Sequence, residues 1–313
     1  MKVVVVEPLG VAQEKLDRLA EEILGQDVEV VYYDHRETDP RKLIARGEDA
    51  EAIIVANQPL SGEVIRGFRK LQFLSVAFTG YDHIDMEACR EKGVVVSNCA
   101  GYSTVAVADL VFGMVISLYR RMRECDSVIR QGGTKDGLIG PELEGKKFGV
   151  IGTGAIGQRV ATIANAFGCE VLAYSRSRKE LPGVRYVELS ELLQESDIIS
   201  LHVPLTEQTK GLIGKEELAQ MKKSAILINT ARGPVVDSAA LAEALKSGQI
   251  AGCGIDVFEQ EPPMNDHPLY HTPNTLITPH IGFATIEALQ KRAKIAYENI
   301  AAWRAGNPQN RVD

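Results

Sequence analysis

Short β-branched runs that alternate with helix-like segments dominate the first hundred residues. Runs such as "KVVVVE", "AIIVAN" and "FLSVAF" are each followed by a stretch with a helical pattern. Continuous apolar runs of this length are typical of strands that are buried on both faces. Their alternation with helices indicates βαβ units and a parallel sheet. A second alternating series begins at residue 146, so the sequence predicts two α/β domains.

One long helical pattern, from Ser103 to Arg130, separates the two series. Its first half is nearly all apolar and its end is basic, as in a buried helix with a solvated C-terminus. Insertion into a membrane is the alternative, but Asp109 and the basic cluster that begins at Arg120 argue against it. We therefore expect a buried or dimer-forming helix.

Composition narrows the possible partners. The chain has 313 residues and a net charge of −7, which gives no support to a nucleic acid or an anionic membrane as partner. No charge-free stretch reaches membrane-spanning length. Five scattered cysteines without C-x-x-C spacing indicate reduced thiols, so we expect a cytoplasmic protein. No His/Cys cluster has the spacing of metal ligands, and no metal is expected.

A glycine motif opens the second series. "VIGTGAIG" places Gly152, Gly154 and Gly157 in G-x-G-x-x-G spacing, after a buried strand and before a helix-like segment. A tight turn without a ligand is the simpler interpretation. However, this context is the one that dinucleotide binding requires, because the backbone and a helix N-terminus must approach a pyrophosphate. The motif, including Ala155 and Ile156, therefore predicts a dinucleotide site.

The segment "YSRSRK" then bears on the choice of coenzyme. NAD-binding units usually end their second strand with an acidic residue, but here that position is Ser175. Arg176 and Arg178, with Ser177 between them, would accept the 2′-phosphate of NADP through charge-assisted hydrogen bonds. A solvated basic loop is the alternative. We expect NADP(H) to be preferred and NAD(H) to be possible.

Three further segments place reactive side chains where strands end. "INTARGPVVD" carries Arg232, "GIDVFEQEP" carries Asp256, Glu259 and Glu261, and "ITPHIGF" carries His280. Ligands of doubly wound sheets bind outside the carboxyl ends of the strands, so one cleft can collect these groups. His35, His267 and His271 are expected at the surface or in loops, and His83 and His202 are expected to be structural.

Taken together, these motifs resemble the D-isomer-specific 2-hydroxyacid dehydrogenases, in particular the glyoxylate and hydroxypyruvate reductases. "GTGAIG", "LHVPLTEQTKGLI", "LINTARGPVVD", "GIDVFEQEP" and "TPHIGFAT" follow one another in that family's order. The resemblance covers essentially the whole chain. It implies two Rossmann-like doubly wound domains. Residues 1–98 and 285–313 would form a flavodoxin-like substrate domain, and residues 99–284 would form the dinucleotide-binding domain.

The resemblance implies a catalytic trio. Arg232 would bind the substrate carboxylate and polarise the carbonyl, His280 would be the general acid and base, and Glu261 would pair with the histidine. Physical chemistry agrees, since a planar guanidinium suits a 2-oxo acid. A neighbouring carboxylate also favours the imidazolium form of histidine.

The resemblance also assigns binding residues. Asp256 would contact the nicotinamide ribose or amide, and the backbone of Phe78, Thr79 and Gly80 would hold the substrate carboxylate together with Arg232 and His280. Further residues would line the coenzyme: Thr104, His202, Val203, Pro204, Thr209, Thr230, Ala231, His280 and Gly282.

Departures from the family bear on the substrate. Most members have glycine where Phe78 stands, and the arginines of the phosphoglycerate branch are missing around Ala56 and Val76. The expected substrate is a small unphosphorylated 2-oxo acid such as glyoxylate, hydroxypyruvate or pyruvate, reduced to the D-2-hydroxy acid.

A homodimer through the cofactor domain is expected. The alternative is a dinucleotide-sensing binding protein, like the corepressors that share this fold.

Overall fold

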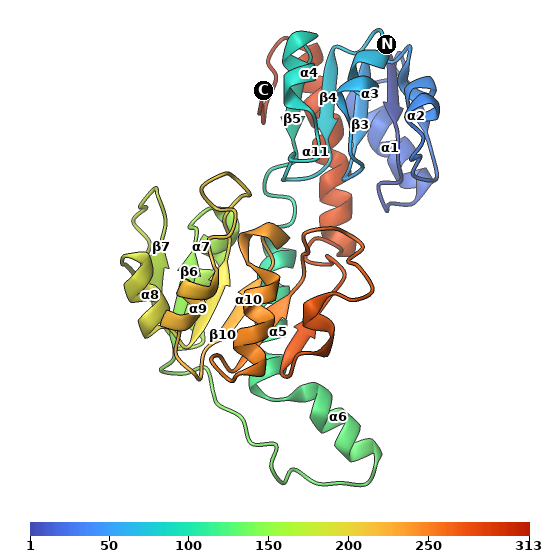
Figure 1. Cartoon of the computed structure of the whole chain (residues 1–313). Helices are drawn as coiled ribbons and strands as arrows, with labels where there is room; N and C mark the ends of the chain where they lie inside the picture. Colours follow the sequence, from blue (N-terminus) through green and yellow to red (C-terminus); the bar gives the residue numbers. More distant parts are fainter. The chain divides into compact units, whose positions relative to one another are not determined.

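The structure is a computed structural model that describes residues 1–313, and the chain divides into two compact units (Figure 1). The first unit contains Met1–Ser103 and Ala284–Asp313, and the second contains Thr104–Phe283. Both units are built on parallel sheets, which confirms the expected α/β class. The roles of substrate domain and dinucleotide-binding domain remain predictions at this point.

The first unit has a five-stranded parallel sheet in the order β2-β1-β3-β4-β5. Helix α11 packs against α1 and β4, while α3 packs against both α2 and α4. Four of its strands are almost entirely buried, as their β-branched composition predicts, whereas the edge strand β2 is exposed or half-buried along its whole length. Its elements are β1 (Lys2–Val5), α1 (Gln13–Leu24), β2 (Glu29–Tyr32), α2 (Pro40–Gly47), β3 (Ala52–Val55), α3 (Gly62–Gly67), β4 (Phe73–Val76), α4 (Met86–Glu91), β5 (Val95–Asn98) and α11 (Ile286–Arg304).

The second unit has a seven-stranded parallel sheet in the order β12-β11-β10-β9-β6-β7-β8. The order in which the strands are added reverses at β6. Strands β7 and β8 lie on one side of β6, and β9 to β12 lie on the other side, so β6 and β9 are neighbours although β7 and β8 lie between them in sequence. Its elements are α5 (Thr104–Tyr119), α6 (Met122–Arg130), β6 (Lys147–Ile151), α7 (Ala155–Ala166), β7 (Glu170–Tyr174), β8 (Val184–Tyr186), α8 (Leu189–Glu195), β9 (Ile198–Leu201), α9 (Lys215–Gln220), β10 (Ile226–Asn229), η1 (Gly233–Val235), α10 (Ser238–Lys246), β11 (Gly252–Ile255), η2 (Pro268–His271) and β12 (Thr275–Ile277).

Alternating strand residues of this sheet supply two separate cores. On one face, Val150 and Ile228 pack with the apolar side chains of α5 and α7. On the other face, Ile151 and Leu227 pack with α8, α9 and α10. Because successive strand residues point to opposite faces, a run of consecutive apolar residues fills both cores at once.

The single long helix expected from Ser103 to Arg130 is wrong. Helix α5 ends at Tyr119, and α6 begins at Met122 after Arg121, whose φ is 47°. A left-handed residue cannot continue a right-handed helix. The Arg121 side chain holds this turn, because its Nη1 donates to the Gly137 carbonyl at 2.6 Å. Helix α5 buries most of its apolar side chains in its own unit, whereas no residue of α6 is buried.

The five cysteines are all free, and four of them are buried. None of the helices combines the length and the apolarity needed to cross a membrane. The structure contains no group of three or more His, Cys, Asp or Glu side chains that could hold a metal ion.

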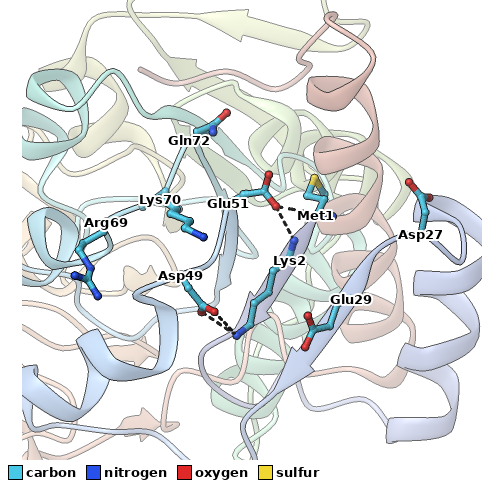
Figure 2. A pocket seen from close by; sticks show the side chains of 10 residues that line it. Met1, Lys2, Asp27, Glu29, Asp49, Glu51, Arg69, Lys70 and Gln72 are labelled. Atoms are coloured by element: carbon cyan, nitrogen blue, oxygen red, sulfur yellow. Dashed lines mark hydrogen bonds and ion pairs between the residues drawn. The ribbon is translucent and has the colours of Figure 1, made fainter.

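The amino edge of the first sheet carries a shallow polar hollow (Figure 2). There, Lys2 Nζ donates to Asp49 Oδ1 at 2.8 Å, and the Lys2 N–H donates to Glu51 Oε2 at 2.8 Å. Ligands of parallel α/β sheets bind at the opposite, carboxyl edge. We therefore interpret the hollow as a part of the surface where charged groups pair with one another, and not as the functional site.

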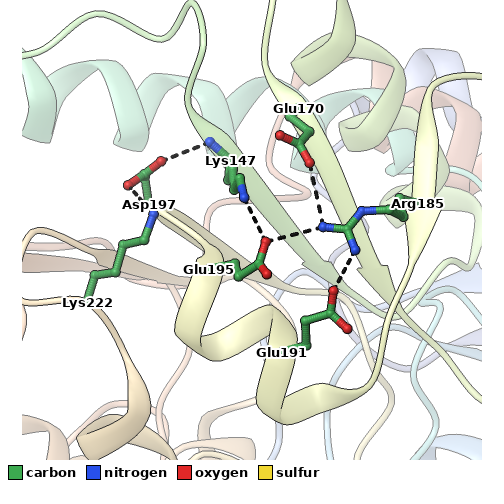
Figure 3. Close-up of polar contacts among 7 residues, drawn as sticks. All are labelled: Lys147, Glu170, Arg185, Glu191, Glu195, Asp197 and Lys222. Atoms are coloured by element: carbon green, nitrogen blue, oxygen red, sulfur yellow. Dashed lines mark hydrogen bonds and ion pairs between the residues drawn. The ribbon is translucent and has the colours of Figure 1, made fainter.

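The amino edge of the second sheet carries a charge network (Figure 3). Arg185 contacts Glu170, Glu191 and Glu195, and Lys147 Nζ also contacts Glu195 at 2.7 Å. Asp197 joins this network through two donors: the Lys147 N–H and Lys222 Nζ, each at 2.9 Å. Burial raises the pKa of Asp197, but the hydrogen bonds from Lys222 and Lys147 outweigh burial and hold the pKa below 3.8.

We predict that Asp197→Asn lowers the melting temperature at neutral pH. A carboxylate with a lowered folded-state pKa stabilises the fold above its unfolded-state pKa, and this contribution is lost as the pH falls through the folded-state value. The difference in melting temperature between the two proteins should therefore shrink well below pH 3.8, the ordinary value. Thermal scans across pH measure it, with Asp126→Asn in the exposed α6 pair as control. A constant difference at all pH values would contradict the assignment.

Candidate active site

Six strands of the second sheet end at the same level. The register pairs Ile277 with Ile255, Ile255 with Asn229, Asn229 with Leu201, Leu201 with Ile151, and Ile151 with Tyr174. Because the strands are parallel, the residues that follow these strand ends emerge side by side at the carboxyl edge. In spatial order, they are Thr278, Asp256, Thr230, His202, Gly152 and Ser175.

In the glycine turn after β6, two of the three motif glycines are closely packed and the third faces open space. Gly152 has φ 95°, and a Cβ there would lie 2.6 Å from the His202 carbonyl oxygen. A Cβ at Gly157 would lie 1.9 Å from the Gly152 oxygen, so α7 must approach β6 through glycine. A Cβ at Gly154 would meet nothing within 4 Å, and no side chain caps the first turn of α7. An open helix N-terminus with this geometry fits the pyrophosphate of a dinucleotide.

The segment after β7 exposes the predicted basic residues. Ser175 is half-buried, while Arg176, Ser177 and Arg178 are exposed. The Arg178 guanidinium donates through Nη2 to Glu188 Oε1 at 3.1 Å. The end of β7 therefore carries no carboxylate of its own, but an acidic side chain from the end of β8 reaches its second arginine.

The "HVP" segment after β9 is held by its own side chains. Ser200 Oγ lies 2.9 Å from His202 Nε2, and burial of the imidazole lowers the pKa of His202 to about 3, although the residue as a whole is only half-buried. Thr209 Oγ1 donates to the Pro204 carbonyl at 2.6 Å and closes the turn that directly follows Val203. The expected coenzyme contacts His202 and Thr209 thus also hold the shape of this turn. The further expected contact Thr104 lies apart from this turn, at the start of α5.

A buried asparagine organises the loop after β10. Asn229 Nδ2 donates to the Arg232 carbonyl at 2.9 Å, and Asn229 Oδ1 accepts from the Ala231 N–H at 3.0 Å. Within this loop, Thr230 Oγ1 is buried without a hydrogen-bond partner. A buried hydroxyl without a partner is costly, so this atom is suited to a polar group of a bound coenzyme.

Asp256, after β11, holds the loop that carries the histidine. Its Oδ1 accepts from Thr278 Oγ1 at 2.5 Å and from the Ile281 N–H at 2.8 Å, and its Oδ2 accepts from the Gly282 N–H at 2.8 Å. The side chain is only 1% exposed, and burial raises the pKa of Asp256 despite these three donors. The residue expected to contact the nicotinamide therefore has both oxygens engaged by the protein.

The predicted catalytic trio is assembled by these loops. His280 has φ 53°, and its N–H donates to the Asp256 carbonyl at 2.8 Å. Its Nδ1 lies 2.7 Å from Glu261 Oε2, while Glu261 Oε1 accepts from the Phe258 N–H at 3.2 Å. Burial raises the pKa of Glu261, but the hydrogen bond from His280 and the nearby Arg232 charge lower it below its ordinary 4.5. Glu261 is therefore a carboxylate at neutral pH.

Arg232 reaches this neighbourhood through close backbone packing. A Cβ at Gly233 would lie 2.0 Å from the Phe258 carbonyl carbon, so the loops after β10 and β11 touch through their main chains. The Arg232 Nη1 donates to the Ala231 carbonyl at 2.8 Å, which bends the guanidinium back toward its own loop.

The predicted substrate residues of the first unit follow β4. Phe78 is 6% exposed, with its ring 6.5 Å from that of His83 and 6.1 Å from that of Tyr102. Thr79 is exposed, and Gly80 is half-buried. The Phe78 ring is therefore part of the packing of its unit. Replacing it with glycine would remove this packing as well as any contact with a substrate.

Two parts of the site were not anticipated. His267, expected in a surface or loop position, is buried, and its Nε2 lies 3.2 Å from Glu259 Oε2. His267 lies in a loop, which was one of the two expected positions, but it is not at the surface, because the ring packs against Phe258 and Tyr270. Asn229 also received no role, although "LINTARGP" contains it. A short polar residue at the end of an apolar strand was the available signal.

Comparison with known proteins identifies the family. Residues 112–282 match the family described as D-isomer specific 2-hydroxyacid dehydrogenase, NAD binding domain. The chain is 40% identical over 291 residues to a glyoxylate reductase of Korarchaeum cryptofilum, covering 88% of this chain and 87% of that protein. It is 41% identical over 285 residues to a glyoxylate reductase of Thermococcus litoralis, covering 87% of this chain and 86% of that protein.

A solved structure agrees with these relatives. An acyclic imino acid reductase in complex with NADPH and D-Arg superposes with a TM-score of 0.91 at 32% identity, and the match covers 100% of both chains. The expected family, fold class and nicotinamide cofactor are thereby confirmed. The chain therefore belongs to the D-isomer-specific 2-hydroxyacid dehydrogenases, and it is an NAD(P)-dependent dehydrogenase.

Proposed function

We propose that this protein reduces a small unphosphorylated 2-oxo acid, such as glyoxylate, hydroxypyruvate or pyruvate, to the D-2-hydroxy acid, with NADPH as the preferred coenzyme. The observation that carries this proposal is the contact of 2.7 Å between His280 Nδ1 and Glu261 Oε2 at the carboxyl edge of the sheet. A histidine held by an ionised carboxylate is suited to give a proton to a developing alkoxide. The glyoxylate reductases among the relatives support this substrate class.

The coenzyme would lie across the level strand ends of the second sheet. Gly152, Gly154 and the open first turn of α7 would receive the pyrophosphate, with the adenosine toward Ser175 and the nicotinamide toward Thr230 and Gly282. The buried Thr230 hydroxyl without a partner supports this direction. When bound, the coenzyme supplies the hydride that reduces the substrate carbonyl.

The protein's own residues would orient the substrate and deliver the proton. Arg232 would bind the carboxylate and the 2-oxo oxygen together, since a guanidinium presents parallel donors. Glu261 engages Nδ1 of His280, so the proton would be given from Nε2. In the first unit, the backbone of Phe78, Thr79 and Gly80 would bind the substrate carboxylate.

We predict that His280→Ala lowers kcat by roughly 100-fold or more, because it removes the proton donor. Arg232→Ala should lower both kcat and substrate affinity, because it removes orientation and charge together. Steady-state kinetics with glyoxylate and NADPH measure both effects. The matched control is His271→Ala, which changes an exposed histidine of the same unit. A His280→Ala protein with near-normal kcat would contradict the catalytic assignment.

The pH dependence tests the partner of the histidine. Glu261 has a lowered pKa, so its side chain keeps its negative charge as the pH falls. The charge is lost only well below neutrality. Glu261→Gln removes that charge and no longer stabilises the imidazolium. The reductive rate should therefore begin to fall at a lower pH than in the unaltered enzyme. An unchanged pH–rate profile would show that Glu261 is not the partner.

We infer the NADPH preference from Ser175, Arg176 and Arg178, and the NADPH complex of the similar imino acid reductase supports it. Ser175→Asp should shift the preference toward NADH, because a carboxylate repels the 2′-phosphate and accepts from the ribose diol. Arg176→Ala should lower kcat/KM with NADPH by about 10- to 150-fold, because one charge-assisted contact is lost. NADH should be almost unaffected, and Arg130→Ala on α6 is the matched control. An unaltered protein that prefers NADH would leave the basic segment as a solvated loop.

We also propose a homodimer that works in the cytoplasm, where the free cysteines would stay reduced. Helix α6 supports the dimer, because it buries none of its side chains and Ile129 is 66% exposed. A short helix that buries none of its side chains is marginally stable, so a second copy of the chain would cover it. Light scattering should give the mass of two chains, and Ile129→Glu should shift the mass toward one. A single-chain mass for the unaltered protein at micromolar concentration would contradict the dimer.

A further inference from the structure

The edge strand β8 brings a tyrosine to the segment that follows β7. Strand β8 pairs only with β7, and its last residue, Tyr186, is half-buried beside the glycine turn and the basic segment. This strand has only three residues, and its short sequence carries no pattern that predicts a strand. The Tyr186 hydroxyl makes two hydrogen bonds: it accepts one and donates the other.

The two bonds belong to a relay of three. The Lys179 N–H donates to the Tyr186 hydroxyl at 3.1 Å, and Tyr186 donates to Thr153 Oγ1, also at 3.1 Å. Thr153 Oγ1 in turn donates to the Ser177 carbonyl at 3.4 Å. Each hydroxyl thus accepts once and donates once, so one orientation of the two hydrogens satisfies the whole relay.

The relay begins at the residue after Arg178 in the chain and ends at the residue before it. It fastens the N–H of the following residue and the carbonyl of the preceding one, so the backbone of Arg178 is held from both sides. Thr153 lies between Gly152 and Gly154 and is only 2% exposed, so the relay is anchored in the glycine turn. Tyr186 therefore connects the turn suited to the pyrophosphate with the arginine expected to receive the 2′-phosphate.

The Arg178 side chain has a restraint of its own. Its contact with Glu188 is an exposed ion pair, and such pairs contribute little in water. A phosphate with a charge near −2 would compete well with one carboxylate for the guanidinium. The backbone anchor, which does not have to break when the coenzyme binds, is then what determines where the arginine can reach.

We propose that Tyr186 is a positioning residue for coenzyme selection: its hydroxyl holds Arg178 at the distance from the glycine turn that a 2′-phosphorylated adenosine requires. This inference rests on the proposed NADPH preference and deepens it. Tyr186 acts through Arg178 and does not itself need to touch the phosphate. The opposing interpretation is that Tyr186 only packs the sheet edge, in which case its hydroxyl would not matter to one coenzyme more than the other.

The test is Tyr186→Phe, which removes the hydroxyl and keeps the ring. Both hydrogen bonds of the hydroxyl are lost, and we expect the ratio of kcat/KM for NADPH to that for NADH to fall roughly 3- to 10-fold, because neutral hydrogen bonds contribute modestly in water. The loss should lie in KM for NADPH, with kcat and the NADH parameters unchanged. Tyr270→Phe is the matched control, because its hydroxyl makes no hydrogen bond in the structure. The melting temperature of each variant checks the fold.

A double-mutant cycle with Arg178→Ala shows whether the two residues act together. Once the arginine is absent, Tyr186→Phe should cause no further loss with NADPH. Additive losses, equal losses with both coenzymes, or an unchanged ratio for Tyr186→Phe would each overturn the positioning role while the proposed NADPH preference stands. An unaltered protein without NADPH preference would instead overturn the proposed coenzyme and this inference with it.

Discussion

The parallel register of the second sheet is the constraint on which the site depends. Ile151 of β6 pairs with Tyr174 on one side and with Leu201 on the other, and the same level continues to Ile277 at the far edge. A strand shifted by one residue would turn its apolar side chains toward the wrong core. Burial on both faces therefore fixes the register, and the register brings six loops to one edge.

Buried carboxylates then hold those loops in shape, and both units use this device. In the second unit, Asp256 accepts from the main chain of the loop that carries His280. In the first unit, Glu7 is 2% exposed, and its Oε1 accepts from the Ala56 and Gln58 N–H groups after β3. A carboxylate that accepts hydrogen bonds from several main-chain N–H groups fixes the shape of an irregular loop. Rigid loops of this kind keep a reacting group within the small tolerance that catalysis allows.

The second unit also separates stability from chemistry. Its amino edge carries the network around Arg185 and Asp197, where every charge has a partner (Figure 3). Its carboxyl edge keeps a buried hydroxyl without a partner, an open helix N-terminus and a histidine with φ 53°. Unsatisfied and strained groups are tolerated where a ligand can compensate for them.

The sequence by itself determined the class of fold, the family and the residues of the proposed site, because β-branched runs, glycine spacing and strand-end motifs are local signals. It did not determine that the helical pattern breaks at Arg121, since a left-handed residue there depends on a hydrogen bond to Gly137. It also did not determine the partner of His267 or the reach of Tyr186, which rest on contacts between segments that are distant in the chain or joined by an irregular loop. Only the tertiary structure decides such contacts, because each depends on where the fold places a second segment of the chain.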